Sequence, residues 1–340
     1  MRLRCLARLA RSSAASAALW VAGCVGAQTP TVTPGGTASA QSFVQAAINA
    51  TGLPPVHEHA SSVSHPSVPL AKTKGALIYV GADDASTVTI FPAKGVNSPP
   101  IGTITDGIDE PERLFVDKKQ RLYVSNRSTV TVYKRGTTSP SLTITGGLNR
   151  PTGIVVANNG YVYVGNAGTY TVSVYPPGKT VPSKTITMPT YEQPQNLAFD
   201  SANDLYVLYL GGSAGSGIIE FAPGSKTGKD LGITVGWPSA IEVDRKGNLI
   251  ALVNGQSIEV FPPGQNQPSR SWNLTSGSGF MLSLNKNEKK LYASEYVGTS
   301  QPYFIIQQLD YPNGSGLTDK ITNGLDSMSW PLSVSPDNVL

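Results

Sequence analysis

One phrase recurs along this chain at a nearly constant interval. It reads LIYVG at Leu77–Gly81 and returns as LYVSN, VYVGN, LYVLY, LIALV and LYASE. The second residues of the six copies occupy positions 78, 123, 163, 206, 250 and 292, so the period stays between 40 and 45 residues. A period in the forties, built from β-rich units, is typical of β-propellers, in which each repeat forms one blade. The spacing therefore predicts six blades.

Each repeat contains four segments with strand character. The first follows a proline, as in PERLFVD (Pro111–Asp117), and the second is the recurring phrase. The third ends in an aromatic residue, as in VTVYK (Val130–Lys134), and the fourth resembles SLTIT (Ser141–Thr145). Weaker copies of the fourth segment lie near Ile233, Trp272 and Ile321. These apolar runs alternate little, as expected of strands covered on both faces. We expect an all-β, six-bladed β-propeller of four-stranded antiparallel blades.

The two ends of the repeat array predict how the ring closes. The first copy, at Leu77–Gly81, lacks a clear strand before it, whereas PLSVSPD (Pro331–Asp337) is a first strand with nothing after it. A strand from the C-terminus would thus become the innermost strand of the first blade and remove exposed edges. The competing segment PSVPLAKTKG (Pro66–Gly75) contains Pro69, which would delete a ladder hydrogen bond. We expect closure by the C-terminal strand and a propeller over residues 66–340.

The N-terminus has the features of a bacterial export signal. A basic head is followed by a short apolar stretch, and VAGC (Val21–Cys24) resembles a lipobox. Cleavage before Cys24 would expose that thiol for lipid attachment; the alternative is ordinary cleavage after VGA (Val25–Ala27). We expect a lipoprotein signal peptide at 1–23, a flexible tether and linker at 24–65, and a lipid anchor in the cell envelope. Val25, in place of an Asp, favours the outer membrane.

The charge and the cysteine content exclude some kinds of partner and of covalent link. The chain holds 26 basic and 22 acidic residues, and the excess of four comes from the signal residues Arg2, Arg4, Arg8 and Arg11. The remainder is neutral, which predicts no nucleic-acid binding. Of the two cysteines, Cys5 leaves with the signal peptide, so no internal disulfide can form. We expect a monomer.

The pattern Pro-x-x-Leu/Ile-x-Val-Asp, Leu-Tyr-Val-x-Asn, Val-x-Val-Tyr-x-x-Gly resembles the NHL-repeat and gluconolactonase-like six-bladed propellers over about residues 77–340. The resemblance implies architecture more than activity, because the scaffold carries enzymes, receptors and adaptors. Lactonase members hold a divalent metal with Glu, Asn and Asp; Glu112, Asn196 and Glu242 have suitable types, but no motif ties them to those positions. Streptogramin lyases and amidating lyases depend on propeller histidines. Here the histidines are His57, His59 and His65, all before the first blade.

The blades thus contain neither a histidine nor a free cysteine, so the common general base and thiol nucleophile are missing. No catalytic residue, metal site or cofactor is identified. The run HEHASSVSH (His57–His65) is interpreted as an exposed linker, with zinc or nickel binding as the alternative. Glu242 interrupts the apolar run AIEVD, and a buried carboxylate needs a partner or a raised pKa; structural pairing and catalysis both stay open.

Two functions compete. The first is non-catalytic binding of a protein, glycan or small molecule on one loop face of an envelope-anchored propeller. The alternative is a metal-dependent hydrolase of the lactonase type, which would need a divalent metal. Metal analysis of the purified protein would separate them.

The binding surface is predicted from topology. In an antiparallel blade, the connections from strand two to three and from strand four to the next blade emerge on one face. Their aromatic and charged residues form the predicted recognition surface. The alternative is that Trp237 and Trp330 plug the channel mouth. The predicted ligand-binding residues are Asp109, Glu110, Arg150, Tyr191, Glu192, Trp237, Tyr296, Asp326 and Trp330.

Overall fold

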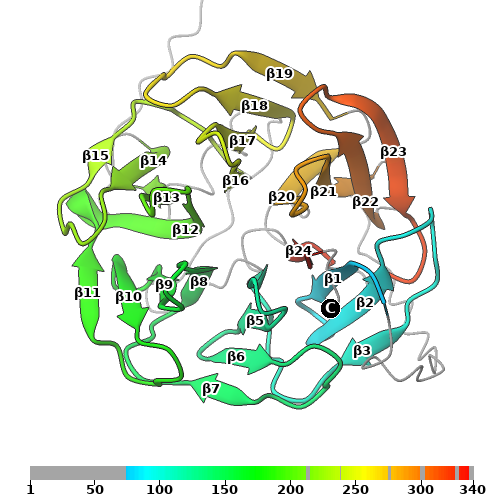
Figure 1. Ribbon diagram of the computed structural model, residues 1–340, viewed down its shortest axis with the longest axis horizontal. Coiled ribbons are helices and arrows are strands. Elements are labelled where there is room, and N and C mark those ends of the chain that lie inside the picture. Colours follow the sequence, from blue (N-terminus) through cyan, green and yellow to red (C-terminus); the bar gives the residue numbers. More distant parts are fainter. Residues whose placement is uncertain are drawn as a thin grey trace, which may run out of the picture. The chain divides into compact units, whose positions relative to one another are not determined.

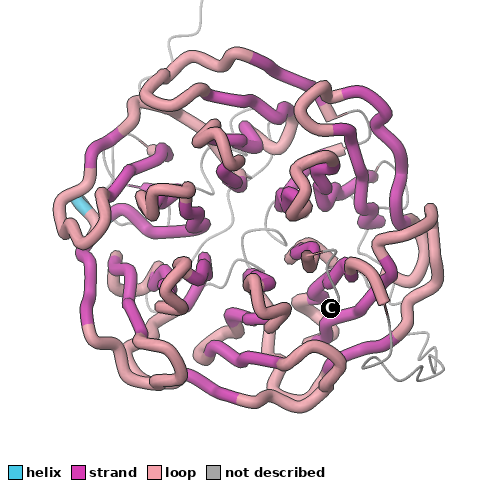
Figure 2. Tube along the Cα trace, viewed as in Figure 1, coloured by secondary structure: helices cyan, strands magenta, loops and turns pink. Residues whose placement is uncertain are grey.

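The computed structural model describes residues 74–211, 215–237, 239–274, 277–298, 303–325 and 329–336. In these ranges, six four-stranded antiparallel sheets are arranged as the blades of a closed ring (Figure 1). The one helical segment among the described residues is a short 3-10 turn, η2 (Pro189–Tyr191) (Figure 2). The all-β, six-bladed prediction is confirmed. The predicted signal peptide, Cys24, the predicted tether and the three histidines lie outside the described residues.

In every blade the strands follow one another from the innermost strand outward (Figure 1). Blade 1 contains β24 (Leu332–Val334), β1 (Leu77–Ala82), β2 (Thr87–Pro92) and β3 (Gly102–Ile104). Blade 2 contains β4 (Arg113–Val116), β5 (Leu122–Ser125), β6 (Val130–Tyr133) and β7 (Leu142–Ile144). Blade 3 contains β8 (Pro151–Val156), β9 (Val162–Asn166), β10 (Thr171–Tyr175) and β11 (Lys184–Thr187).

The other three blades follow the same order. Blade 4 contains β12 (Glu192–Phe199), β13 (Leu205–Gly211), β14 (Ser216–Phe221) and β15 (Lys229–Asp230). Blade 5 contains β16 (Ala240–Val243), β17 (Leu249–Val253), β18 (Ser257–Phe261) and β19 (Arg270–Asn273). Blade 6 contains β20 (Ser278–Leu284), β21 (Lys290–Val297), β22 (Tyr303–Asp310) and β23 (Ser315–Ile321).

The ring closes through its C-terminal strand. β24 pairs antiparallel with β1, with Tyr79 opposite Ser333. The ladder is extended at both ends, because Gly81 N donates to Pro331 O (2.8 Å) and Ser335 N donates to Leu77 O (2.8 Å). The predicted closure by the C-terminal segment is therefore confirmed.

Apolar side chains fill the spaces between blades. Every residue of β1 and of β5 is buried, because each blade packs against a neighbour on both sides. Between blades 3 and 4, for example, Val172 and Ile186 share a cluster with Leu197 and Val207. Burial on both faces explains why the strand sequences do not alternate between apolar and polar residues.

The fourth strand of blade 4 differs from the prediction. The sequence places it near Ile233, whereas β15 is Lys229–Asp230. Ile233 and Val235 follow that strand, and both are buried in a cluster with Ile241. Their apolar character reflects packing between blades 4 and 5 and not membership of a strand.

All six blade junctions contain a hydrogen bond between a side chain and the backbone of the adjoining blade. These bonds link innermost strands or their immediate neighbours, so they form a polar circuit around the ring. The pairs are Ser333 with Val116, Ser125 with Thr152, Thr152 with Pro194, Asn196 with Ile241, Glu242 with Leu284, and Ser283 with Val334.

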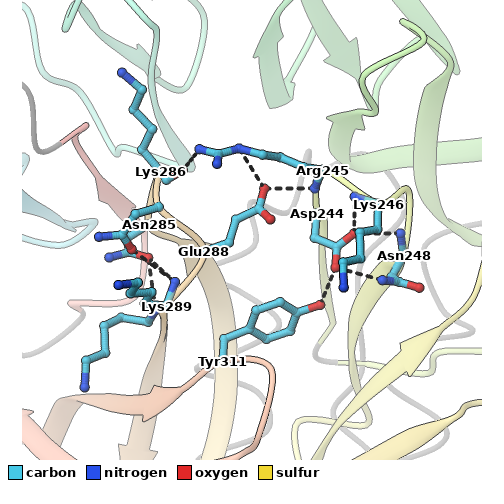
Figure 3. Close-up of polar contacts among 11 residues, drawn as sticks. Asp244, Arg245, Lys246, Asn248, Asn285, Lys286, Glu288, Lys289 and Tyr311 are labelled. Carbon is cyan, nitrogen blue, oxygen red and sulfur yellow. Dashed lines mark hydrogen bonds and ion pairs between the residues drawn. The ribbon is translucent and has the colours of Figure 1, made fainter.

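Aspartates organise the turns between first and second strands. Asp244 accepts hydrogen bonds from Lys246 N (2.9 Å) and Asn248 N (2.8 Å), as Figure 3 shows. A further bond comes from blade 6, where Tyr311 donates its hydroxyl to Asp244 Oδ2 at 2.7 Å. Asp117 likewise accepts hydrogen bonds from Lys119 N and Arg121 N. These carboxylates thus serve as hydrogen-bond acceptors that hold the turns between the two strands.

Candidate functional site

Loops from neighbouring blades meet on one face of the ring. Arg127 N, from the β5–β6 connection, donates to Asp109 O in the β3–β4 connection at 2.9 Å. The fully buried amide of Asn126 fixes this contact, because its Oδ1 accepts Asp109 N at 3.1 Å. Asn166 does the same in the next blade, accepting Asn149 N at 3.0 Å. We call this surface, formed by the two sets of connections that the sequence analysis grouped, the loop face.

Buried polar atoms without a hydrogen-bond partner gather at this face. Among the described residues, five side chains at this face each have one such atom. All five side chains stand at the loop-face end of a first or second strand. Arg113 and Glu192 open β4 and β12, and Tyr296 is near the end of β21. Ser239 is the residue before β16, and Trp330 is two residues before β24. Buried polar groups are normally satisfied, so this end of the ring is the candidate site for ordered water or a ligand. The atoms are Arg113 Nε, Glu192 Oε2, Ser239 Oγ, Tyr296 OH and Trp330 Nε1.

Arg113 and Trp330 form the centre of the candidate site. The Arg113 guanidinium lies 5.0 Å from the Trp330 ring centroid, and its Nη1 donates to Glu112 O at 2.9 Å. The two side chains are 3% and 2% exposed. Burial lowers the pKa of Arg113 to about 10, while the neighbouring Glu112 raises it. The guanidinium therefore stays charged at neutral pH.

A row of aromatic rings extends from Trp330. Phe280 lies 6.4 Å from Trp330 and 5.9 Å from Phe304, and Tyr296 lies 5.4 Å from Phe304. Trp330 was expected to be exposed, and that part of the prediction is wrong, because its indole is buried between Arg113 of blade 2 and Phe280 of blade 6. Its part in ligand binding stays a prediction. Phe280 and Tyr296 keep part of their surface accessible.

Carboxylates cluster beside this centre. Asp83, in the β1–β2 turn, is only 2% exposed. Burial raises the pKa of Asp83 to about 8, with further contributions from Glu112, Glu110, Asp84 and Asp109. Glu110 forms an ion pair with Arg127 at 2.9 Å, and Asp109 is exposed. Of the predicted residues, Asp109 and Glu110 thus share one acidic neighbourhood.

Tyr191 and Glu192 form a second predicted pair that the structure brings together. Tyr191 is 74% exposed, and its ring meets Tyr170 edge-to-face at 5.5 Å. Both tyrosines have positive φ, 60° and 57°, a conformation that side chains of this size rarely adopt. Glu192 beside them is buried, and its pKa is raised by burial and by Asp230. An exposed aromatic ring thus stands next to a buried carboxyl group.

The remaining predicted residues lie apart from these groups. Arg150 is half-buried with φ of 50°, and its carbonyl accepts Ala167 N at 3.0 Å. Trp237 is half-buried in the β15–β16 connection. Asp326 lies outside the described residues. Sequence reasoning missed Arg113 and Ser239; the signal for Arg113 was a charged residue opening an otherwise apolar strand.

Glu242 belongs to the polar circuit of the ring. Its position in β16, opposite Ile250, matches that of Ser283 opposite Tyr292 and Ser333 opposite Tyr79. Each of the three side chains accepts a hydrogen bond from the backbone of the following blade. The equivalent residues of blades 2, 3 and 4 are Phe115, Val155 and Ala198. Burial raises the pKa of Glu242 to about 8, and the bond from Leu284 lowers it.

Other features of the described residues are less informative. Nowhere in these ranges do three or more His, Cys, Asp or Glu side chains converge in a group able to hold a metal ion. The described part of the chain contains no helix long and apolar enough to cross a membrane. Two hollows, of about 50 and 20 Å³, lie between blades under the Pro263–Gly264 and Pro223–Gly224 turns. They repeat the same inter-blade position and have room for a few water molecules.

Comparison with known proteins supports the fold and leaves activity open. No protein-family model matches the sequence, and no curated protein matches it. A protein of unknown function from Bacteroides caccae is similar in structure, with a TM-score of 0.58 and 12% identity over 78% of this chain and 100% of that one. A streptogramin B lyase is similar with a TM-score of 0.52 and 10% identity, over 79% of this chain and 89% of that one. A gluconolactonase from Xanthomonas campestris has a TM-score of 0.47 and 18% identity, over 69% of this chain and 86% of that one. At these identities the likeness concerns the fold alone.

Proposed function

We propose that this protein is a non-catalytic binding protein that takes a ligand at the loop face of its propeller. The observation that carries the proposal is the set of five buried polar atoms without partners, all at one end of the ring. Leaving a buried polar atom unmatched costs about 1–3 kcal/mol. A ligand or bound water that satisfies these atoms recovers part of that cost, which favours binding there.

The scaffold suits such a role. The loop connections are fixed by buried amides such as Asn126 and Asn166, and the blades are joined at all six junctions by hydrogen bonds. Binding residues held on a rigid frame lose little entropy when a ligand arrives. Exposed Tyr191 adds an aromatic surface at the rim of the same face.

The proposal includes export and a lipid anchor at Cys24. It rests on the basic head, the apolar stretch and the VAGC sequence of the N-terminus. Cys24→Ser is expected to remove lipid labelling and move the protein out of the membrane fraction. Membrane association that survives in Cys24→Ser would contradict the anchor, and the loop-face proposal would be unaffected.

The binding proposal is tested by a ligand screen with variants on both faces. After a screen of glycans, peptides and small molecules against the purified mature protein, Tyr191→Ala and Trp237→Ala should weaken binding of the ligand found. Lys118→Ala, Asn159→Ala and Lys246→Ala, in the turns of the opposite face, are the matched controls and should bind as the parent does. Equal losses on both faces, or a ligand that protects only the opposite face from hydrogen exchange, would sink the proposal.

The alternative hydrolase is addressed by metal analysis of the same preparation. A divalent ion bound in a 1:1 ratio, together with lactone hydrolysis that depends on it, would replace the binding proposal with the lactonase-type one. A preparation that hydrolyses none of a panel of lactones with added calcium, magnesium, manganese or zinc supports the binding proposal.

A further inference from the structure

We infer that the loop-face ligand presents a carboxylate to Arg113 and Trp330. The inference rests on the proposed function and names the chemical class of its ligand. Both unmatched atoms at the centre of the site, Arg113 Nε and Trp330 Nε1, are N–H donors. A group that offers acceptor oxygens and no competing donor is therefore required, and a carboxylate is the common organic group of that kind.

The charge of Arg113 strengthens this assignment. Among the described residues, no carboxylate lies within ion-pair distance of its guanidinium, whose other contacts are Glu112 O and the face of Trp330. A buried cation that no ion pair neutralises is expensive, and a ligand carboxylate that forms this ion pair stabilises the complex. The guanidinium is planar, and in this geometry it can donate two parallel hydrogen bonds to the oxygens of one carboxylate.

The row of rings beside Trp330 indicates the rest of the ligand. Phe280 and Tyr296 are partly accessible, and the Tyr296 hydroxyl is another unmatched group farther along the row. An apolar or flat body attached to the carboxylate would lie against Phe280. The acidic side chains Asp109, Glu110 and Glu112 lie close enough to Asp83 to raise its pKa, and Glu112 is next to Arg113 in sequence. Their charge disfavours a ligand that carries a second negative group.

The experiment compares each carboxylate with its uncharged amide. Acetate, benzoate and 1-naphthoate are titrated into the purified mature protein by calorimetry at fixed ionic strength, beside acetamide, benzamide and 1-naphthamide. We expect one site, tighter binding of each acid than of its amide, and affinity that rises from acetate to naphthoate. Charged hydrogen bonds of this kind predict a preference of about 10- to 100-fold for the acid.

Variants locate the site. Arg113→Lys keeps the charge and loses the planar pair of donors, and Trp330→Phe keeps the ring and loses the indole N–H; each should weaken naphthoate binding about tenfold or more. Arg127→Lys is the matched control, an arginine on the same face that is paired with Glu110. If Arg113→Lys does not fold, Trp330→Phe and the acid–amide comparison in the parent still decide the question.

Several results would overturn the inference. Equal binding of acids and amides, tighter binding of inorganic phosphate than of any carboxylate, or full affinity in both Arg113→Lys and Trp330→Phe would each do so. A neutral ligand from the screen whose affinity falls in Tyr191→Ala and not in Arg113→Lys would remove the carboxylate assignment while leaving the proposed function in place.

Discussion

Ser333 accepts a hydrogen bond from Val116 N at 3.1 Å, across 217 positions of sequence. The bond joins β24, near the C-terminus, to the innermost strand of blade 2. Blade 1 is thus held on one side by Ser333 and on the other by the bond from Val334 N to Ser283 Oγ (3.0 Å). The C-terminal strand is therefore part of two blade junctions as well as of its own sheet.

Deleting residues 331–340 should destabilise the whole ring. The deletion removes the ladder with β1 and two of the six junction bonds, so we expect one cooperative transition with a Tm lower by about 10 °C or more. Deleting residues 337–340 alone leaves β24 in place and serves as the control. Calorimetry that finds the two truncated proteins equally stable would contradict this account of closure.

Tyr311→Phe should weaken the junction of blades 5 and 6. The change removes the hydroxyl that reaches Asp244 at 2.7 Å and leaves that buried carboxylate with one donor fewer (Figure 3). We expect a loss of about 1–2 kcal/mol in the free energy of unfolding, measured with urea. Tyr123→Phe is the control, because its longer bond to Asp117 (3.3 Å) stays within one blade. A larger loss in the control would argue against a junction role for Tyr311.

Glu242→Gln should change how stability depends on pH. Burial raises the pKa of Glu242 from 4.5 to about 8, so the folded protein holds this proton more tightly than the unfolded chain does. Stability is then fully present below pH 4.5 and is lost as pH rises to about 8, by at most about 1.4 kcal/mol per unit. The amide of Gln still accepts the Leu284 N–H and cannot ionise, so the variant should be the more stable protein at pH 9.

The pH profile needs a second variant, because burial also raises the pKa of Asp83 to about 8. Asp83→Asn should remove a separate part of the slope, and the double variant should be the flattest of the four proteins between pH 5 and 9. A Glu242→Gln profile parallel to that of the parent over this range would show that Glu242 does not contribute.

Trp330→Ala should destabilise the ring, whereas Tyr191→Ala should not. Trp330 is 2% exposed and packs between Arg113 and Phe280, so its removal leaves a cavity that costs about 3–5 kcal/mol. Tyr191 is 74% exposed, and its removal should change stability by less than about 0.5 kcal/mol. Urea denaturation of both variants measures the difference. Equal stabilities would mean that Trp330 does not carry this packing.

The sequence predicts the ring because its signal is repeated. Six copies of one phrase, with prolines and glycines between them, specify strand number and order, and the unpaired PLSVSPD segment specifies closure. Single-copy features are harder to predict. Ile233 has the character of a strand residue and is a core residue, and Trp330 follows a loop yet is interior. In both cases the observed position differs from the predicted one because the residue packs against the neighbouring blade, which local sequence does not reveal.

The candidate site is less predictable for the same reason. Sequence reasoning reached the correct connections, yet five separate strand ends had to be brought to one face before the unmatched atoms could be recognised. Arg113 carries the same side chain as Arg127, which lies on the same face, and only the fold distinguishes a buried guanidinium under a tryptophan from one paired at the surface with Glu110.

The central place of β1 in its sheet has a mechanical consequence. The chain that precedes Lys74 joins the ring at β1, which pairs with β24 on one side and with β2 on the other. A pulling force transmitted along that preceding segment therefore strains two ladders at once, instead of peeling a single edge strand. Forced unfolding depends on the barrier that must be crossed, and two ladders loaded together raise it. A strand contributed from the far end of the chain thus reinforces the point at which a tethered propeller would be pulled.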